Sequence, residues 1–459
     1  MKIGLFLLAG SMVTSAVFAA PQKKPYEIST AANGMEILSI PMPKVPLVTI
    51  VLVAKAGSMT ELPTSNGLTH VWEHMFFKGN QRLPNQEAFN KRIRQLGITF
   101  NGDTSPEMVR YYFTLPSKNL DSGLQFMADA IGTPLIEASE LERERKVVLD
   151  EYDRNASQPG FDLHNIERMV IYGSQEHLRN PLGRRSLIEK ATRDQLMQIK
   201  QDVFVPANSA LVVAGDVDPT KITQMVNKHF ISWKTPDGWK PVDRGAFPAF
   251  PQTTDIVKTH PLAQYVNEQI TWNGPRASVE KDDTRVIDVL IQLLDHRSGK
   301  FFKKYIDSGL TLNSGFSYQT QGRAGELVLY AMTSPENAVK AKEELLKEPN
   351  EWLKPGYFTK VQLEDVRRKL KINYKMELNK PSAFGKTMAF WWATTGLNYY
   401  DSYISGMEKV TFKDIDAVIR KYLIGKPYVA VTLLNPKEAE IAKLKDNSAP
   451  FVEKYLKNY

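Results

Sequence analysis

The chain has 459 residues, no cysteine and a formal net charge of +8 at pH 7. Its length suffices for two or more domains with large cores, and the lack of cysteine excludes stabilisation by disulfide bonds. The positive charge is mild for this size and forms no concentrated Lys/Arg block, which favours a solvated surface over a nucleic-acid-binding role.

The N-terminal residues have the pattern of a secretory signal peptide. Met1 and Lys2 precede an apolar run, residues 3–9, and small residues follow as far as Ala19. We expect residues 1–19 to be removed and the protein to be exported to the periplasm. A membrane anchor is the less favoured alternative because the apolar run is short. No later stretch approaches the roughly 18 apolar residues of a spanning helix, so no stable membrane span is expected.

The most informative segment is His70-Val71-Trp72-Glu73-His74, which follows a predicted strand at residues 47–54. In a helix, His70 and His74 project from one face, where two imidazoles can bind one divalent metal ion. Glu73 can then reach a water on that metal. The order His-x-x-Glu-His is the inverted form of the common zinc-peptidase signature. Only seven histidines occur in the chain, so two merely packed or solvated histidines in this order are the less favoured alternative.

Residues 100–104, Phe-Asn-Gly-Asp-Thr, are ambiguous by themselves. Asn-Gly-Asp is a strong turn signal, and local sequence alone favours a turn here. The following stretch, residues 111–116, reads as a strand that leads into a helix.

Residues 139–152 predict a second helix of interest, with Ser139 as its N-cap and acidic residues in its first turn. Glu144 and Glu151 are seven residues apart and therefore share a face. A catalytic zinc site needs a third protein ligand, so one glutamate could bind the metal while the other orients a ligand or the water. A charged surface helix explains the spacing equally well.

Taken together, these motifs resemble the pitrilysin/insulinase family of zinc metallopeptidases, which includes the mitochondrial processing peptidase. That family has a His-x-x-Glu-His helix and a downstream glutamate ligand, in a helix with another glutamate seven residues earlier. The flanking words also match, at residues 67–69 and 75–79. Residues 100–105 resemble the family's Asn-Ala-x-Thr-Ser strand.

The resemblance implies a set of roles around one Zn²⁺ per chain. His70, His74 and Glu151 would be the metal ligands, Glu73 the catalytic general base and Glu144 a supporting catalytic acid. Manganese or cobalt could fit the same ligands. No serine lies in a nucleophile-elbow context, and nothing suggests a covalent intermediate.

The resemblance also changes the expectation for residues 100–104, from a turn to a sheet edge near the metal. An extended peptide could add to such an edge through main-chain hydrogen bonds. Asn101, Gly102 and Asp103 would then be substrate-binding residues, with Gly102 allowing close approach of the substrate backbone.

The second half of the chain echoes the first. A capped amphipathic helix, a short turn and a strand start at Thr192 and again at Thr411, and the helix with Glu151 is echoed at residues 362–370. A repeat of domain length implies duplicated domains. We expect an α+β fold of two similar domains, each a mixed, mostly antiparallel sheet packed against helices.

The Pro-rich stretch near residues 233–254 predicts the linker between these domains. Residues 20–235 would be the metal-bearing catalytic domain, residues 236–254 the linker and residues 255–459 the homologous domain without metal. The aromatic residues at 390–392 and at 399–400 are expected in the core rather than in a chamber or an interface.

The second half lacks a metal-binding set, and the pair Asp295-His296 is expected to be an ordinary polar pair. Family members hold the substrate with an Arg and, seven residues later, a Tyr in this half. Here Tyr305 and Leu312 occupy those positions, so the substrate clamp is incomplete.

This departure predicts an oligomer. In a heterodimer, a related subunit would supply the Arg/Tyr clamp; in a homodimer, Lys304 and Tyr318 would take its place. The sequence thus favours an exported zinc endopeptidase for short or unfolded peptides, as the zinc-bearing subunit of an oligomer. The alternatives are a non-catalytic assembly subunit and a processing peptidase for one dedicated precursor.

Overall fold

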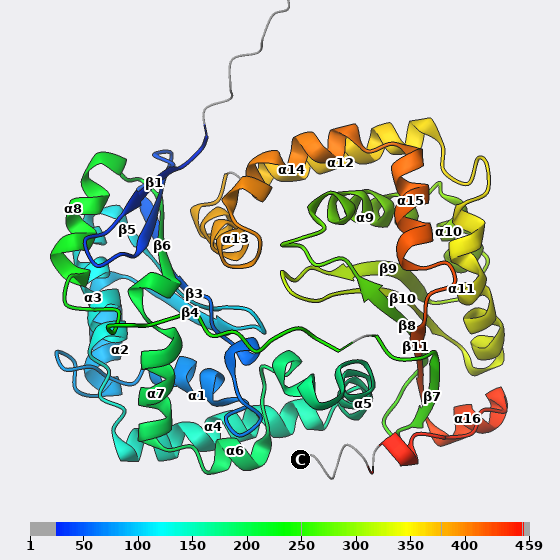
Figure 1. Cartoon of the computed structure of the whole chain (residues 1–459), viewed down its shortest axis with the longest axis horizontal. Coiled ribbons are helices and arrows are strands. Elements are labelled where there is room, and N and C mark those ends of the chain that lie inside the picture. Colours follow the sequence, from blue (N-terminus) through cyan, green and yellow to red (C-terminus); the bar gives the residue numbers. More distant parts are fainter. Residues whose placement is uncertain (1–23, 249, 378, 452, 454–459) are drawn as a thin grey trace, which may run out of the picture.

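The computed structural model describes residues 24–248, 250–377, 379–451 and 453, so the predicted signal peptide lies outside the described residues. The described chain folds around two sheets, one in each half of the sequence (Figure 1). None of the helices in the described ranges is long and apolar enough to cross a membrane.

Both sheets follow the same plan. The first has the strand order β1-β2-β6-β3-β5-β4, and the second has the order β7-β11-β8-β10-β9. Each contains one parallel pair, β2–β6 and β7–β11, while its other pairs are antiparallel. The predicted α+β fold with two mixed, mostly antiparallel sheets is confirmed. The strands are β1 (Glu27–Thr30), β2 (Glu36–Pro41), β3 (Leu47–Ala54), β4 (Thr99–Thr104), β5 (Val109–Pro116), β6 (Ser209–Gly215), β7 (Thr254–Thr259), β8 (Val266–Gly274), β9 (Asn313–Gln319), β10 (Gly325–Thr333) and β11 (Tyr428–Leu434).

Helices surround each sheet, and the described residues between α8 and β7 form no helix or strand. In the first half the α-helices are α1 (Leu68–Met75), α2 (Gln86–Leu96), α3 (Leu120–Gly132), α4 (Ala138–Ala156), α5 (Phe161–Tyr172), α6 (Arg185–Glu189), α7 (Arg193–Val203) and α8 (Pro219–Phe230). In the second half they are α9 (Lys281–Leu294), α10 (Lys300–Phe302), α11 (Ala338–Trp352), α12 (Lys360–Glu377), α13 (Pro381–Thr394), α14 (Leu397–Lys409), α15 (Phe412–Tyr422) and α16 (Pro436–Ala442). Short 3₁₀ segments include η1 (Ser58–Thr60) and η3 (Gly173–Arg179), and η5 (Lys303–Asp307) is a π-helical turn.

Local sequence explains some of the helix starts. Thr192 and Thr411 both form the capping boxes expected of them. The predicted N-cap at Ser139 is wrong, because α4 begins at Ala138 and Glu137 is its N-cap residue, without a side-chain cap bond. Ser139 therefore lies inside the first helical turn.

Each half covers part of the other half's sheet (Figure 1). Helix α13, from the second half, packs on β3 and β6, where Phe384 and Met388 join a buried cluster with Val51 and Val212. Helix α5, from the first half, packs on β11. Because β3 is covered on both faces, its sequence is an almost uninterrupted apolar run. The packing of α13 and α5 on the sheets of the opposite halves fixes the two halves against each other.

The aromatic stretch on α13 and α14 only partly forms core. Trp392, Tyr399 and Tyr400 are buried as expected, whereas Phe390 and Trp391 are half-buried. These last two line a cavity of about 770 Å³ among α12, α13 and α14.

Candidate metal centre and substrate edge

Helix α1 is held at its start by the buried carboxylate of Glu61, which directly follows η1. Glu61 accepts hydrogen bonds from the backbone N–H groups of Gly67 (2.9 Å) and Thr69 (2.8 Å), and from the Asn66 side chain. Burial raises the pKa of Glu61, while these bonds favour its charged form. Gly67 has a φ of 96°, and an added Cβ there would lie 2.7 Å from the Cα of Gly183. The loop before α1 is therefore tightly fixed, which sets the direction of the helix.

The structure brings His70, His74 and Glu151 together, from α1 and α4. Glu151 Oε2 lies 3.8 Å from His70 Nε2 and 3.7 Å from His74 Nε2, and one donor atom of each residue lies within 4.8 Å of the others. Two imidazole nitrogens and a carboxylate oxygen at this spacing fit the donor set of a catalytic zinc site. Among the described residues, this is the one group of histidine and acidic side chains that could hold a metal ion.

Glu144 supports the set from behind. Its Oε2 lies 3.2 Å from His74 Nδ1, and its Oε1 lies 2.7 Å from Lys78 Nζ. Such a carboxylate fixes the ring orientation of a metal-ligating histidine. His70 has no comparable support, since its buried Nδ1 has no hydrogen-bond partner among the described residues.

The charges at this site differ strongly between the two histidines. Burial, together with the neighbouring His74, lowers the pKa of His70 to about 4. Burial acts in the same direction on His74, but its bonds to Glu144 and Glu151 outweigh it and raise its pKa to about 9. The bond to His74 holds the pKa of Glu151 below its ordinary value.

Glu73 lies beside the three converging side chains. Its Oε2 is 3.9 Å from His70 Nε2, and Thr104 Oγ1 donates to the same oxygen over 3.5 Å. Burial raises the pKa of Glu73 to about 7. A carboxylate with a pKa near neutrality is suited to take and return a proton.

Residues 99–104 form β4, the outermost strand of the first sheet, so the local turn signal was misleading. Gly102 packs directly against Glu73: an added Cβ would lie 2.2 Å from Glu73 Oε1. The backbone N–H of Gly102 donates to Asn101 Oδ1 at 2.9 Å. Asp103 forms an ion pair with Arg110 on β5 at 2.8 Å. Of the three predicted substrate-binding residues, Gly102 thus faces the catalytic candidates and Asp103 is engaged with Arg110.

Sequence reasoning did not assign roles to several residues that complete this region. Lys78 and Thr104 lie within the quoted motifs, so their proximity to the site has a sequence signal. Glu61 has none, because its partners are backbone N–H groups and an amide.

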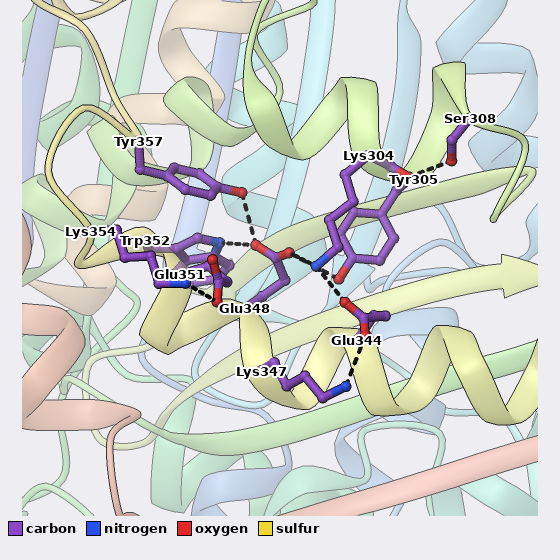
Figure 2. Close-up of polar contacts among 10 residues, drawn as sticks. All are labelled: Lys304, Tyr305, Ser308, Glu344, Lys347, Glu348, Glu351, Trp352, Lys354 and Tyr357. Carbon is purple, nitrogen blue, oxygen red and sulfur yellow. Dashed lines mark hydrogen bonds and ion pairs between the residues drawn. The ribbon is translucent and has the colours of Figure 1, made fainter.

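The two clamp positions, Tyr305 and Leu312, lie in very different surroundings, and Figure 2 shows those of Tyr305. Tyr305 is buried, and its hydroxyl donates to Glu348 Oε1 at 3.2 Å. Glu348 is fully buried and also accepts from Lys304, Trp352 and Tyr357 at 2.6–2.8 Å. Leu312 is 58% exposed. Tyr305 is therefore part of an internal network of the second half.

The two residues considered for a clamp in a homodimer, Lys304 and Tyr318, have their polar groups bound to other residues of the second half. Lys304 is ion-paired with Glu344 (2.8 Å) and Glu348, and the Tyr318 hydroxyl donates to Pro275 O at 2.8 Å. Both polar ends are thus engaged within the second half. His296, of the pair Asp295-His296, lies 3.8 Å from Asp365 Oδ2.

This fold, with two imidazoles and a carboxylate converging from an inverted motif and a second helix, is that of the inverted-motif zinc peptidases. The chain belongs to the insulinase family of peptidases, family M16. The model of "Insulinase (Peptidase family M16)" matches residues 36–183, and that of "Peptidase M16 inactive domain" matches residues 190–370.

Individual relatives agree with this assignment. The chain is 26% identical to a zinc protease, PqqE, from Helicobacter pylori, over 77% of this chain and 79% of that protein. It is 26% identical to the mitochondrial-processing peptidase subunit beta of Lentinula edodes, over 89% of this chain and 90% of that protein. The crystal structure of a protease from Helicobacter pylori has the same fold, with a TM-score of 0.81, 21% identity, and coverage of 90% of this chain and 99% of the other.

Proposed function

We propose that this protein is an exported, zinc-dependent endopeptidase that hydrolyses short or unfolded peptides. The observation that carries the proposal is the convergence of His70, His74 and Glu151 beside the buried carboxylate of Glu73. Relatives named as zinc proteases support it. The N-terminal sequence pattern supports removal of residues 1–19 and a periplasmic location.

In this mechanism His70, His74 and Glu151 hold the ion, and Glu144 with Lys78 orients His74. Bound zinc supplies Lewis acidity and lowers the pKa of a water molecule. Glu73 takes the proton of that water at a carboxylate oxygen and later gives it to the leaving amine.

The substrate lies along β4 in this proposal. β4 pairs on one side only, so its other edge can accept an extended peptide as an added strand. The Asn101 side chain must first release the Gly102 N–H. The contact of Gly102 with Glu73 then brings the peptide backbone close to the carboxylate that activates water.

A related subunit completes the substrate clamp. Tyr305 is committed to Glu348, and the Leu312 side chain offers no hydrogen-bonding group, so these two positions supply no Arg/Tyr pair. The match to a processing-peptidase beta subunit supports a heterodimer. In this arrangement residues 20–235 form the catalytic domain, residues 236–254 the linker and residues 255–459 the domain without metal.

A non-catalytic assembly subunit is the second candidate. It is favoured by the "inactive domain" match in the second part of the chain and by the incomplete clamp. Processing of one dedicated precursor would use the same chemistry on a narrower substrate. The intact donor set favours the peptidase over the assembly subunit.

The test is metal content together with hydrolysis of a mixed peptide library, with and without the related subunit. Glu73→Gln should keep zinc and lose turnover, and Glu87→Gln, an exposed glutamate on α2, is the matched control. Unchanged turnover in Glu73→Gln would remove this residue from the mechanism. Full activity of the lone chain would reject the need for a partner's clamp.

A further inference from the structure

The turn between β4 and β5, residues 105–108, is held on one side by the first half. Met59 N donates to Pro106 O at 2.8 Å. Gly57, just before η1, packs so closely that an added Cβ would lie 2.0 Å from Ser105 O. The end of the candidate substrate strand is thus fixed to the segment that leads into α1.

On its other side the same turn is held by the second half. The Glu107 carboxylate accepts the backbone N–H of Gly322 at 2.7 Å and that of Arg323 at 2.8 Å, in the turn between β9 and β10. Burial disfavours the charge of Glu107, while these two bonds and the nearby guanidinium of Arg179 favour it. A paired, charge-assisted contact of this kind fixes both turns relative to each other.

The residues around the contact between Glu107 and the β9–β10 turn are closely packed. An added Cβ on Gly322 would lie 2.5 Å from Thr394 O, at the end of α13. Arg179, on η3, also reaches across to Glu326 on β10 at 3.1 Å. The β9–β10 turn is therefore wedged between Glu107 and the helix that covers the first sheet.

The turn is continuous with the candidate site in two directions. Backwards along β4 lie Thr104 and Gly102, which contact Glu73. The turn is also bonded to Met59, and Glu61, two residues further along the chain, accepts hydrogen bonds from the backbone N–H groups at the start of α1. A shift of the turn would therefore move both the substrate edge and the helix that carries Glu73.

We propose that Glu107 is a positioning residue, through which the second half holds β4 and α1 in register for hydrolysis. The backbone N–H groups of Gly322 and Arg323 supply the anchor. This gives the half without metal a direct part in the reaction, and it rests on the proposed function, because the groups it positions are those that would bind the peptide and activate water.

The experiment compares Glu107→Ala and Glu107→Gln with the wild type in the full chain, together with the related subunit. Glu440→Ala, an exposed glutamate on α16, is the control. We expect kcat/KM to fall about 10–100-fold in Glu107→Ala, as for other ~1 Å misplacements of reacting groups. Glu107→Gln keeps one acceptor oxygen, so its kcat/KM should lie between those of the wild type and Glu107→Ala. Zinc content should stay at one per chain.

Amide hydrogen exchange provides a readout that needs no activity. Exchange should rise in residues 99–108 and 320–325 of Glu107→Ala, with α3 unchanged. Activity of Glu107→Ala within twofold of the wild type would overturn the proposal. So would a loss of activity matched by loss of zinc, with faster exchange throughout the chain. If the wild type cleaves no peptide, the proposed function fails, and the exchange result alone decides whether Glu107 fastens the two turns.

Discussion

Gly102 and Glu73 are in direct contact, although one lies on a sheet edge and the other on a helix. An added Cβ at position 102 would lie 2.2 Å from Glu73 Oε1 and 2.9 Å from its carboxyl carbon. No side chain fits there unless the carboxylate moves. The contact couples the edge on which a peptide would lie to the group that would activate water.

Gly102→Ala should therefore reduce turnover about 100-fold, because the methyl group displaces either Glu73 or β4. Zinc content should not change, since Gly102 has no side chain and supplies no ligand to the metal. Peptidase assays with metal analysis check this. The control is Gly132→Ala, where the nearest atom would be 3.9 Å away, at ordinary contact distance. Normal turnover in Gly102→Ala would show that the contact has no part in catalysis.

Glu144→Gln should weaken zinc binding about 10–100-fold, because His74 loses the carboxylate that orients its ring. Lys78 also loses its ion pair. Competition with a chromophoric chelator measures the affinity. Glu142→Gln, on an exposed position of the same helix, is the matched control. Equal affinities of the two variants would contradict the supporting role of Glu144.

Zinc binding should release about one proton at neutral pH. The pKa of His74 is raised to about 9 in the metal-free protein, so its ring is protonated below that pH, and zinc requires the neutral form. Apparent affinity should rise about tenfold per pH unit from neutrality to about pH 9 and then level off. His70, with a pKa of about 4, is already neutral and adds nothing in this range. Calorimetric titrations in buffers of different ionisation enthalpy count the protons.

The same shift affects the stability of the metal-free protein in the opposite direction. Because the folded-state pKa of His74 lies above its ordinary value, its contribution is complete below about pH 6.5 and is lost as pH rises through about 9. Metal-free protein should thus lose stability over that window.

A zinc affinity that stays flat between neutrality and pH 9 would show that His74 carries no such proton.

Glu348→Leu should destabilise the second half by about 3–5 kcal/mol, because it removes the common acceptor of a buried network (Figure 2). Lys304 keeps its ion pair with Glu344. Denaturant unfolding measures the change. Glu351→Gln, a partly exposed neighbour paired with Lys354, should change stability by less than about 0.5 kcal/mol. Zinc content should remain normal, since the network lies in the second half and the candidate ligands His70, His74 and Glu151 lie in the first.

Several features follow from local sequence because their physics is local. His70 and His74 share a face through helix periodicity alone, and the caps at Thr192 and Thr411 depend on residues three positions away. The apolar run of β3 follows from burial on both faces. The α+β fold could be predicted from such elements and from their repetition.

Other features required the tertiary structure. Asn-Gly-Asp reads locally as a turn, yet pairing with β5 makes it an edge strand. The Tyr305 hydroxyl is bound by Glu348, which lies more than forty residues away in the sequence. Glu61 and Glu107 bind backbone N–H groups, which every residue except proline offers, so no residue pattern marks their partners. The sequence by itself determined which side chains could bind a metal, because that depends on residue type and helical spacing. Only the fold decided which distant segments hold them in place, because those contacts are set by packing between the two halves.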